Sequence, residues 1–214
     1  MNKKNFCFVG VDHDFEDFIL LNKNFYLGLF TNFRNKKFSL NKRLGKENLS
    51  DWLKIKKKFN PEVFILINEG KQRELLQKKI YKKNNSNLLL DERLISKSSL
   101  KYLSKKSGIV IQKSVFVSSR VKINEGVKIH IGCQIHHGVN IGKYSTISPA
   151  SIILGNVKIG NYSFIGANST IKQNIKIGKN SIIGAGAVVV KNVKDGATVV
   201  GNPASKINYK KIIY

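Results

Sequence analysis

Cysteine, proline and long apolar runs are scarce in this chain, and each shortage excludes a class of protein. Its 214 residues include two cysteines and three prolines. Cys7 and Cys133 stand far apart in apolar stretches, where a free thiol behaves as a small hydrophobe, so neither a disulfide framework nor a cysteine-based metal site is predicted. No uninterrupted apolar run approaches the roughly 18 to 20 residues of a membrane-spanning helix, and the start MNKKNFCFVG carries no cleavage site. We expect a soluble, cytoplasmic protein without an integral membrane segment.

Acidic residues are also few, with 13 Asp and Glu against 38 Lys and Arg and a net charge of +25. Such a charge raises the question of a nucleic-acid partner. The excess is nevertheless spread evenly, because residues 1–110 carry 24 − 11 = +13 and residues 111–214 carry 14 − 2 = +12. Lysine outnumbers arginine 33 to 5, whereas phosphate and base readout favours the bidentate guanidinium group. We interpret the lysines as solvated faces and predict no nucleic acid; attraction to anionic ligands, membrane lipid or RNA is the alternative.

From Val115 onward the sequence follows a period of six residues, which is neither helical nor that of a simple hairpin sheet. The first place of each hexapeptide is Val, Ile, Cys, Ser or Ala, and the fourth is often Gly, which we interpret as a short strand, a corner and a restart. A sandwich of alternating strands would place its turns less regularly. The third place holds an unbroken aliphatic series: Val117, Ile123, Ile129, Ile135, Ile141, Ile147, Ile153, Ile159, Ile165, Ile171, Ile177, Ile183 and Val189.

The first half of the chain has a different pattern, in which apolar runs alternate with amphipathic stretches. This alternation predicts βαβ units on a parallel sheet, and such sheets bind ligands beyond the carboxyl ends of their strands. We expect strands over 5–10, 25–30, 62–67 and 87–90, and helices over 15–22, 47–58 and 71–82.

The whole arrangement resembles the sugar O-/N-acyltransferase family, which includes sialic acid O-acetyltransferases and UDP-4-amino-sugar N-acetyltransferases. The likeness rests on the hexapeptides, on GNVKIGNYSFIGAN (residues 155–168) and on VGNPA (residues 200–204). It implies an α/β N-terminal Rossmann-like domain followed by an all-β left-handed parallel β-helix. The domains expected from it are a sugar-nucleotide-binding domain (1–90), a linker (91–112), a β-helix acetyltransferase domain (113–205) and a C-terminal tail (206–214).

The resemblance also implies an activity and an assembly. Members transfer an acetyl group from acetyl-CoA to an amino or hydroxyl group of a sugar, in bacterial surface-glycan or glycoprotein synthesis. Three chains form a homotrimer, and acetyl-CoA lies in the groove between neighbouring β-helices. The nucleotide-sugar substrate is held by the N-terminal domain and reaches the same groove.

Residue by residue, the family's catalytic histidine matches His137, in the segment Ile135-His136-His137-Gly138. The acceptor must lose a proton while it attacks the thioester, and an imidazole accepts protons near neutral pH. The acid that follows this histidine in the family is replaced by Gly138, and the preceding acid is replaced by His136. We expect His136, His130 or a carboxylate of a neighbouring subunit to take its role, or activity to be weakened, and a glutamate at position 138 to restore the partner.

The remaining site residues also come from the resemblance. The acetyl-CoA contacts are small residues at repeat corners, where the thin pantetheine arm lies against backbone, together with a threonine in place of a family histidine: Thr146, Gly166, Ala167, Gly184 and Ala185. The substrate contacts follow the first three strands, in loops that are poorer in glycine and acid than those of the family: Gly10, Asp12, His13, Thr31, Asn32, Asn68 and Arg73.

Two other functions stay open at this point. One is a catalytically silent β-helix that binds or scaffolds, suggested by Gly138 and Thr146. The other is a metal-dependent hydratase that uses His130, His136 and His137, because histidine is the commonest zinc ligand. Residues six apart fall on consecutive faces of one coil, so ligands from one chain would point in different directions. We therefore predict no metal in a single chain and leave an intersubunit histidine site as the alternative.

Overall fold

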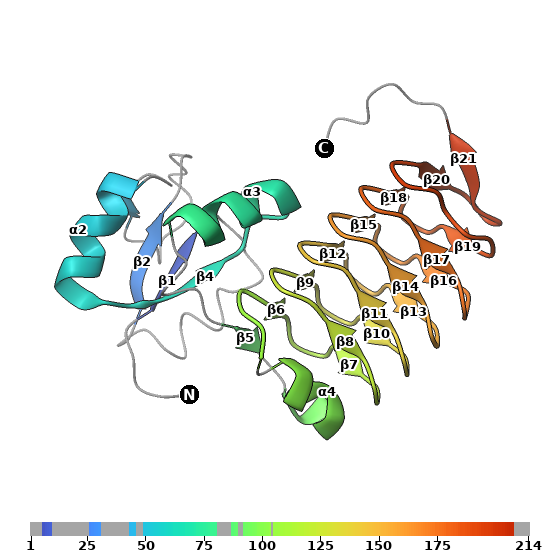
Figure 1. The fold of residues 1–214 in the computed structure, drawn as a ribbon, viewed down its shortest axis with the longest axis horizontal. Coiled ribbons are helices and arrows are strands. Elements are labelled where there is room, and N and C mark those ends of the chain that lie inside the picture. Colours follow the sequence, from blue (N-terminus) through green and yellow to red (C-terminus); the bar gives the residue numbers. More distant parts are fainter. Residues whose placement is uncertain are drawn as a thin grey trace. The chain divides into compact units, whose positions relative to one another are not determined.

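The computed structural model of the chain divides into two compact units, residues 1–87 and residues 88–214 (Figure 1). It describes residues 6–9, 26–30, 43–45, 49–80, 87–89, 92–103 and 105–207. Within these residues no helix is long and apolar enough to cross a membrane.

The first unit contains a four-stranded parallel sheet with the strand order β3-β2-β1-β4. Its buried core includes Cys7, Val9, Val63 and Ile65, with Trp52 of a helix packed among them. Strand β3 was not expected from the sequence, because its three residues have no apolar alternation to mark them. The strands are β1 (Phe6–Val9), β2 (Tyr26–Phe30), β3 (Arg43–Gly45) and β4 (Glu62–Ile65).

The helices of this unit have clear local causes. Helix α2 (Leu49–Phe59) is followed by Asn60, whose φ of 43° is not helical, and then by Pro61, which has no backbone N–H to donate. Helix α3 (Gly70–Leu75) begins after Glu69, whose carboxylate accepts hydrogen bonds from two backbone N–H groups of the first turn. It continues as a π-helix, η2 (Leu76–Ile80). The helix expected over 15–22 lies outside the described residues.

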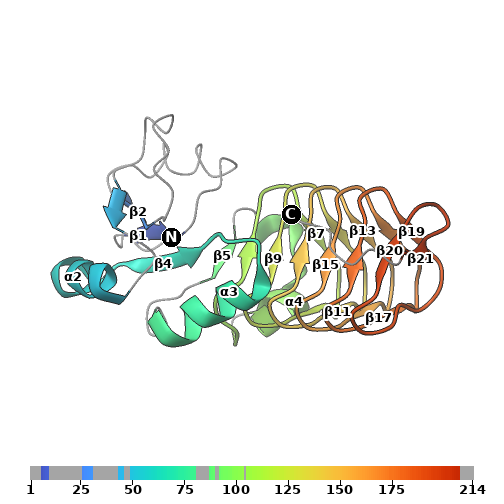
Figure 2. The same ribbon diagram turned by 90° about the horizontal axis from the view of Figure 1, so that it is seen from above.

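The second unit is a parallel β-helix, in which two-residue strands stack coil upon coil to form three faces (Figures 1 and 2). The first face contains β5 (Leu88–Leu89), β6 (Val110–Ile111), β9 (Lys128–Ile129), β12 (Thr146–Ile147), β15 (Phe164–Ile165), β18 (Ile182–Ile183), β20 (Thr198–Val200) and the antiparallel β21 (Ser205–Ile207). The second face contains β7 (Phe116–Val117), β10 (Gln134–Ile135), β13 (Ile152–Ile153), β16 (Thr170–Ile171) and β19 (Val188–Val189). The third face contains β8 (Lys122–Ile123), β11 (Asn140–Ile141), β14 (Lys158–Ile159) and β17 (Lys176–Ile177).

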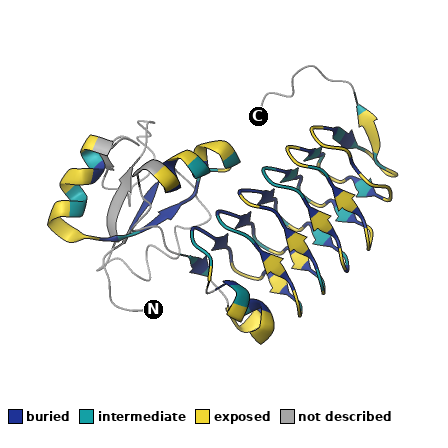
Figure 3. Cartoon of the chain, in the orientation of Figure 1, coloured by how far each residue is buried: buried dark blue, intermediate teal, exposed yellow. Residues whose placement is uncertain are grey.

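The expected hexapeptide core is confirmed. All thirteen third-place aliphatic side chains are buried. From Val117 to Ile171 the register pairs each with its counterpart 18 residues later, as Ile135 pairs with Ile153. The first-place side chains are buried as well. The strands of the second and third faces therefore show one buried residue beside a more exposed one (Figure 3), whereas both residues are buried in β6, β9 and β12 of the first face.

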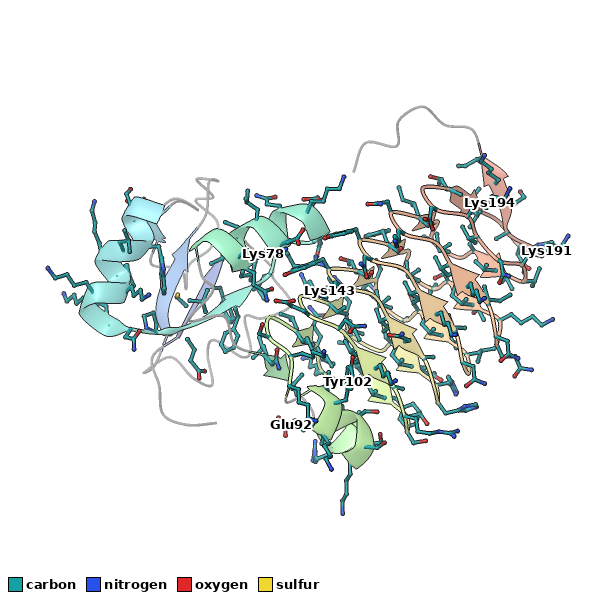
Figure 4. All side chains as sticks on the ribbon, viewed as in Figure 1. Lys78, Glu92, Tyr102, Lys143, Lys191 and Lys194 are labelled. Atoms are coloured by element: carbon teal, nitrogen blue, oxygen red, sulfur yellow. The ribbon has the colours of Figure 1, made fainter. Side chains whose placement is uncertain are left out.

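The β-helix begins earlier than the hexapeptides suggested. Strand β5 pairs with β6 and not with the first sheet, so the expectation of a fourth N-terminal strand over 87–90 is wrong; Leu88 is buried where its backbone continues the first face. Residues 91–112, expected as a linker, contain η3 (Glu92–Leu94), α4 (Lys97–Leu103) and β6. Helix α4 is hydrogen-bonded to the β-helix. The hydroxyl of Tyr102, labelled in Figure 4, donates a hydrogen bond to Oδ1 of Asn124, which follows β8, at 3.0 Å.

The corners of the coils use two kinds of residue. A left-handed backbone recurs at the sixth place of the hexapeptide, where glycine adopts it most easily but other residue types adopt it as well. The fourth-place glycines, interpreted from the sequence as turn formers, have a different cause. A Cβ atom on Gly142 would lie 2.5 Å from the carbonyl carbon of Gly160 in the next coil, so these glycines permit close stacking. The left-handed places are Ser114, Arg120, Gly126, Gly132, Gly138, Tyr144, Ala150, Asn156, Tyr162, Asn168, Asn174, Asn180 and Gly186.

The outward side chains differ between two of the faces. The third face presents exposed polar residues in register: Lys122, Asn140, Lys158 and Lys176. The second face presents a more apolar row that is exposed or half-buried: Phe116, Gln134, Ile152, Thr170 and Val188. The third face therefore suits water, and the second suits burial against another surface.

Candidate functional site

His137 lies at the corner between the second and third faces. Strand β10 ends at Ile135 and β11 begins at Asn140, so the two histidines between them occupy the turn. The side chain of His137 is exposed, and its ring covers Gly155 one coil later. A Cβ atom on Gly155 would lie 2.6 Å from Cε1 and 2.7 Å from Nε2 of that ring. The imidazole is thus reachable from solvent on one side and supported by backbone on the other.

His136 is half-buried on the second-face side of the same corner. Its ring meets Phe116 of the preceding coil edge-on, with centroids 6.2 Å apart and an interplanar angle of 69°. The imidazole of His136 is therefore packed against the aromatic ring of Phe116. His136 is therefore better suited to shaping the corner than to collecting a proton from a ligand.

His130 lies at the other edge of the second face, at the corner between the first and second faces, and is buried with 7% exposure. The three histidines are consequently not gathered at one point in the chain. Among the residues that the structure describes, no group of three or more His, Cys, Asp and Glu side chains could hold a metal ion.

Gly138 has a backbone φ of 70°, and its open side is occupied by the side-chain oxygen of Asn156 from the next coil. Nδ2 of Asn156 donates a hydrogen bond to Oδ1 of Asn174 at 3.3 Å, which continues the row one coil further. A side chain at position 138 would be strained by its backbone and would collide with Asn156. The expectation that a glutamate here would restore the acidic partner is therefore not supported by the local geometry.

Ala167 and Ala185 lie one coil apart at the corner between the first and second faces. Ala167 is half-exposed and Ala185 is exposed, so small side chains line this edge. The glycines beside them permit close stacking, since a Cβ atom on Gly166 would lie 2.5 Å from the backbone nitrogen of Ala185, and one on Gly184 would lie 2.7 Å from Cγ1 of Val200. The result is a corner of small residues between closely stacked coils.

The proposed residues fall on different sides of the β-helix. His137 and the two alanines lie at opposite edges of the second face. Thr146 lies on the first face and is buried, with 2% exposure. One chain alone therefore does not bring these residues around a single point.

In the first unit, Arg73 is buried, and its Nη1 donates hydrogen bonds to the carbonyl oxygens of Ile67 at 2.8 Å and of Asn68 at 2.5 Å. Arg73 thus holds the backbone of the segment that follows β4, whereas the side chain of Asn68 in that segment is exposed. The other substrate candidates, Gly10, Asp12, His13, Thr31 and Asn32, lie outside the described residues.

Both cysteines are buried free thiols. Burial raises the pKa of the Cys133 thiol to about 11, although three backbone hydrogen bonds oppose the shift, and burial raises the pKa of Cys7 further. Sγ of Cys133 donates a hydrogen bond to the carbonyl oxygen of Ser148 at 3.0 Å. Neither thiol has the exposed, thiolate-stabilising surroundings of a nucleophile.

A cavity of about 500 Å³ lies at the C-terminal end of the β-helix. Its lining includes the apolar residues Val193 and Val199 and the cationic residues Lys191, Lys194 and Lys206. Figure 4 marks the first two of these lysines at this end. The sequence did not reveal the cavity, because it depends on where the stack of coils stops.

Comparison with known proteins agrees with this description. The bacterial transferase hexapeptide family (six repeats) matches residues 139–173 and 156–191. A search of the curated proteins found no match. Among solved structures, the acetyltransferase domain of PglB from Neisseria gonorrhoeae, in complex with acetyl coenzyme A, is 19% identical over 95% of this chain and 99% of its own, with a TM-score of 0.80.

Two further solved structures share the fold. PerB from Caulobacter crescentus, in complex with CoA and GDP-perosamine, is 18% identical over 95% of this chain and 97% of its own, with a TM-score of 0.81. WeeI from Acinetobacter baumannii is 22% identical over 95% and 100%, with a TM-score of 0.73. The chain therefore contains repeats that match the bacterial transferase hexapeptide family between residues 139 and 191, and it shares its fold with these solved structures.

Proposed function

We propose that the chain is an acetyltransferase that moves the acetyl group of acetyl-CoA to an amino or hydroxyl group of a nucleotide-linked sugar, in bacterial surface-glycan or glycoprotein synthesis. The main support is that solved structures with acetyl coenzyme A, or with CoA and GDP-perosamine, match about the whole chain and not the β-helix alone. The perosamine N-acetyltransferase among them makes an amine the first acceptor to test.

The first unit is proposed to hold the nucleotide sugar as a Rossmann-like domain. Its support is the four-stranded parallel sheet, because ligands of such sheets bind beyond the carboxyl ends of the strands. Arg73 fixes the segment after β4 at this edge through its two carbonyl contacts. Arg73 is thus assigned to shape the substrate loop, and Asn68 to face the substrate.

His137 is proposed as the general base. In the reaction the acceptor nitrogen or oxygen attacks the thioester carbonyl, His137 takes the proton that the acceptor loses, and the C–S bond breaks to release CoA, whose sulfur ends protonated. The exposure of His137 allows such an approach. The two buried thiols make a covalent acyl-cysteine step a poor alternative, so direct transfer between two positioned reactants is proposed.

The complete site is proposed to need two chains of a homotrimer. His137 and the Ala167–Ala185 corner occupy opposite edges of the second face, so one ligand reaches both most simply if they come from neighbouring copies. The apolar second face would be covered in that assembly, and the lysine-bearing third face would stay in water. Acetyl-CoA would then lie along the small corner residues with its thioester near His137 of the next chain.

The test is an acetyl-transfer assay with acetyl-CoA and a panel of UDP-amino sugars and GDP-perosamine, in which released CoA is read with a thiol reagent. Sugar-dependent release is expected, and His137→Ala should lower turnover by about 10²- to 10⁴-fold with little change in acetyl-CoA affinity. His130→Ala and His136→Ala are the matched controls. Calorimetry that finds no CoA binding at millimolar ligand would reject the transferase and favour a silent scaffold; a chain that binds zinc and releases no CoA would favour the intersubunit hydratase.

A further inference from the structure

Gly155 is unlike the other glycines in the corners of the β-helix. The fourth-place glycines, such as Gly142, would place a Cβ atom against backbone of the next coil, and the sixth-place glycines have a left-handed φ. Gly155 has neither constraint. Its backbone is one that any L-residue adopts, and the three atoms nearest to its absent Cβ all belong to the imidazole of His137, at 2.6, 2.7 and 3.3 Å.

The two residues are also tied through their backbones. Asn156, which follows Gly155, donates its backbone N–H to the carbonyl oxygen of His137 at 2.9 Å. Gly155 is buried although it lies at a corner, whereas His137 is exposed. The ring therefore rests on the backbone of the next coil, and the missing side chain at position 155 is what allows it to rest there.

We propose that Gly155 is a positioning residue for His137: its bare backbone is the support that sets where the imidazole lies. The inference rests on the proposed function, because the position of the ring matters only if His137 takes a proton. A methyl group at position 155 would displace the ring by contact with Cε1 and Nε2, the edge that faces the next coil. Misplacing a catalytic group by about 1 Å costs on the order of 10²-fold in rate.

The experiment is Gly155→Ala, assayed as the whole chain. The fold should survive, because the methyl group meets only the movable end of a side chain. Turnover should fall by roughly 10- to 100-fold while KM for acetyl-CoA stays within about twofold. Gln173→Ala, at the equivalent exposed corner position one coil further, is the matched control and should keep wild-type turnover.

A double-mutant cycle separates positioning from a general structural effect. In the His137→Ala background, Gly155→Ala should cause no further loss of turnover, because no ring remains to be displaced. The chain has four histidines, so the Cε1–Hε1 resonance of His137 can be identified by NMR from the His137→Ala spectrum. Gly155→Ala should shift that resonance and leave the His130 resonance in place.

The failures of the two proposals are distinguishable. If His137→Ala loses activity but Gly155→Ala keeps both the wild-type turnover and the ring resonance, Gly155 does not position the base and the inference is overturned. A further loss in the His137→Ala background overturns it as well, because the effect would then not pass through the ring. If His137→Ala itself keeps full turnover, the proposed base is wrong, and the inference falls with it.

Discussion

The side-chain oxygen of Asn156 occupies the place beside Gly138 where a side chain at position 138 would begin. The corner that follows His137 is thus completed by an amide from the next coil and not by a residue of its own. An acid introduced at position 138 must displace this amide and also adopt a left-handed backbone.

This relationship predicts that Gly138→Ala destabilises the chain more than Gly132→Ala does. Both glycines have a φ near 70°, so both variants lose about 1 to 2 kcal/mol from the backbone. A Cβ atom on Gly132 meets nothing closer than 4.0 Å, whereas one on Gly138 meets Asn156 and should cost about 1 to 3 kcal/mol more. Urea unfolding measures both, and Asn156→Gly combined with Gly138→Ala should remove the difference. Equal losses in the two single variants would contradict the crowding.

A second prediction concerns the corner of small residues. Ala167→Trp should abolish CoA binding in calorimetry while the assembly stays intact, because position 167 points outward and lies outside the aliphatic stack. Lys113→Trp changes the exposed residue three coils earlier at the same corner and should bind CoA as the wild type does. Binding by the Ala167→Trp variant at wild-type affinity would place the ligand elsewhere.

The third prediction is assembly. Light scattering or analytical ultracentrifugation at micromolar concentration should give a homotrimer. Ile152→Lys, which adds a charge to the second face, should weaken it, because an unpaired ammonium group would be taken out of water. Asn140→Lys adds the same charge to the exposed third face and should leave the trimer unchanged. A stable wild-type monomer would remove the two-chain site.

The fourth prediction follows from the cysteines. Since burial raises the pKa of Cys133 from 9.0 to about 11 and raises that of Cys7, a thiol reagent at pH 8 should label neither in the folded chain and both after denaturation. The raised pKa of Cys133 also stabilises the fold below pH 9, and this contribution should be lost as the pH rises through 11. Rapid labelling of the folded chain at pH 8 would contradict the burial.

The β-helix could be predicted from the sequence because its period has a direct physical cause. Every third-place side chain, from Val117 to Val189, points into the same interior, so the aliphatic series records the fold residue by residue. The structural role of each glycine was harder to predict. Gly142 is needed because a Cβ atom there would collide with the backbone of the next coil, whereas Gly138 adopts a left-handed backbone, and the sequence does not distinguish the two cases. A periodic sequence fixes which residues are inside, but not which atoms of neighbouring coils meet.

The site was predictable to a smaller extent. The sequence singled out His137 and missed Gly155, although 155 − 137 = 18 is the spacing of one coil, and that offset is the signal that could have found it.

Two short strands of the fold were also predicted incorrectly. Strand β3 was not expected, and β5 was assigned to the wrong sheet, because two or three residues carry too little pattern to show which sheet they join.

The regular coil also governs how the chain can change in length. Six residues carry it across one face, so an insertion or deletion of six between His137 and Ala167 would transfer every later residue to the neighbouring corner. A change of 18 residues would keep each residue at its corner and move it along the axis by one strand spacing, about 4.8 Å. Homologous chains can therefore lengthen or shorten the span between the histidine corner and the alanine corner only by whole coils.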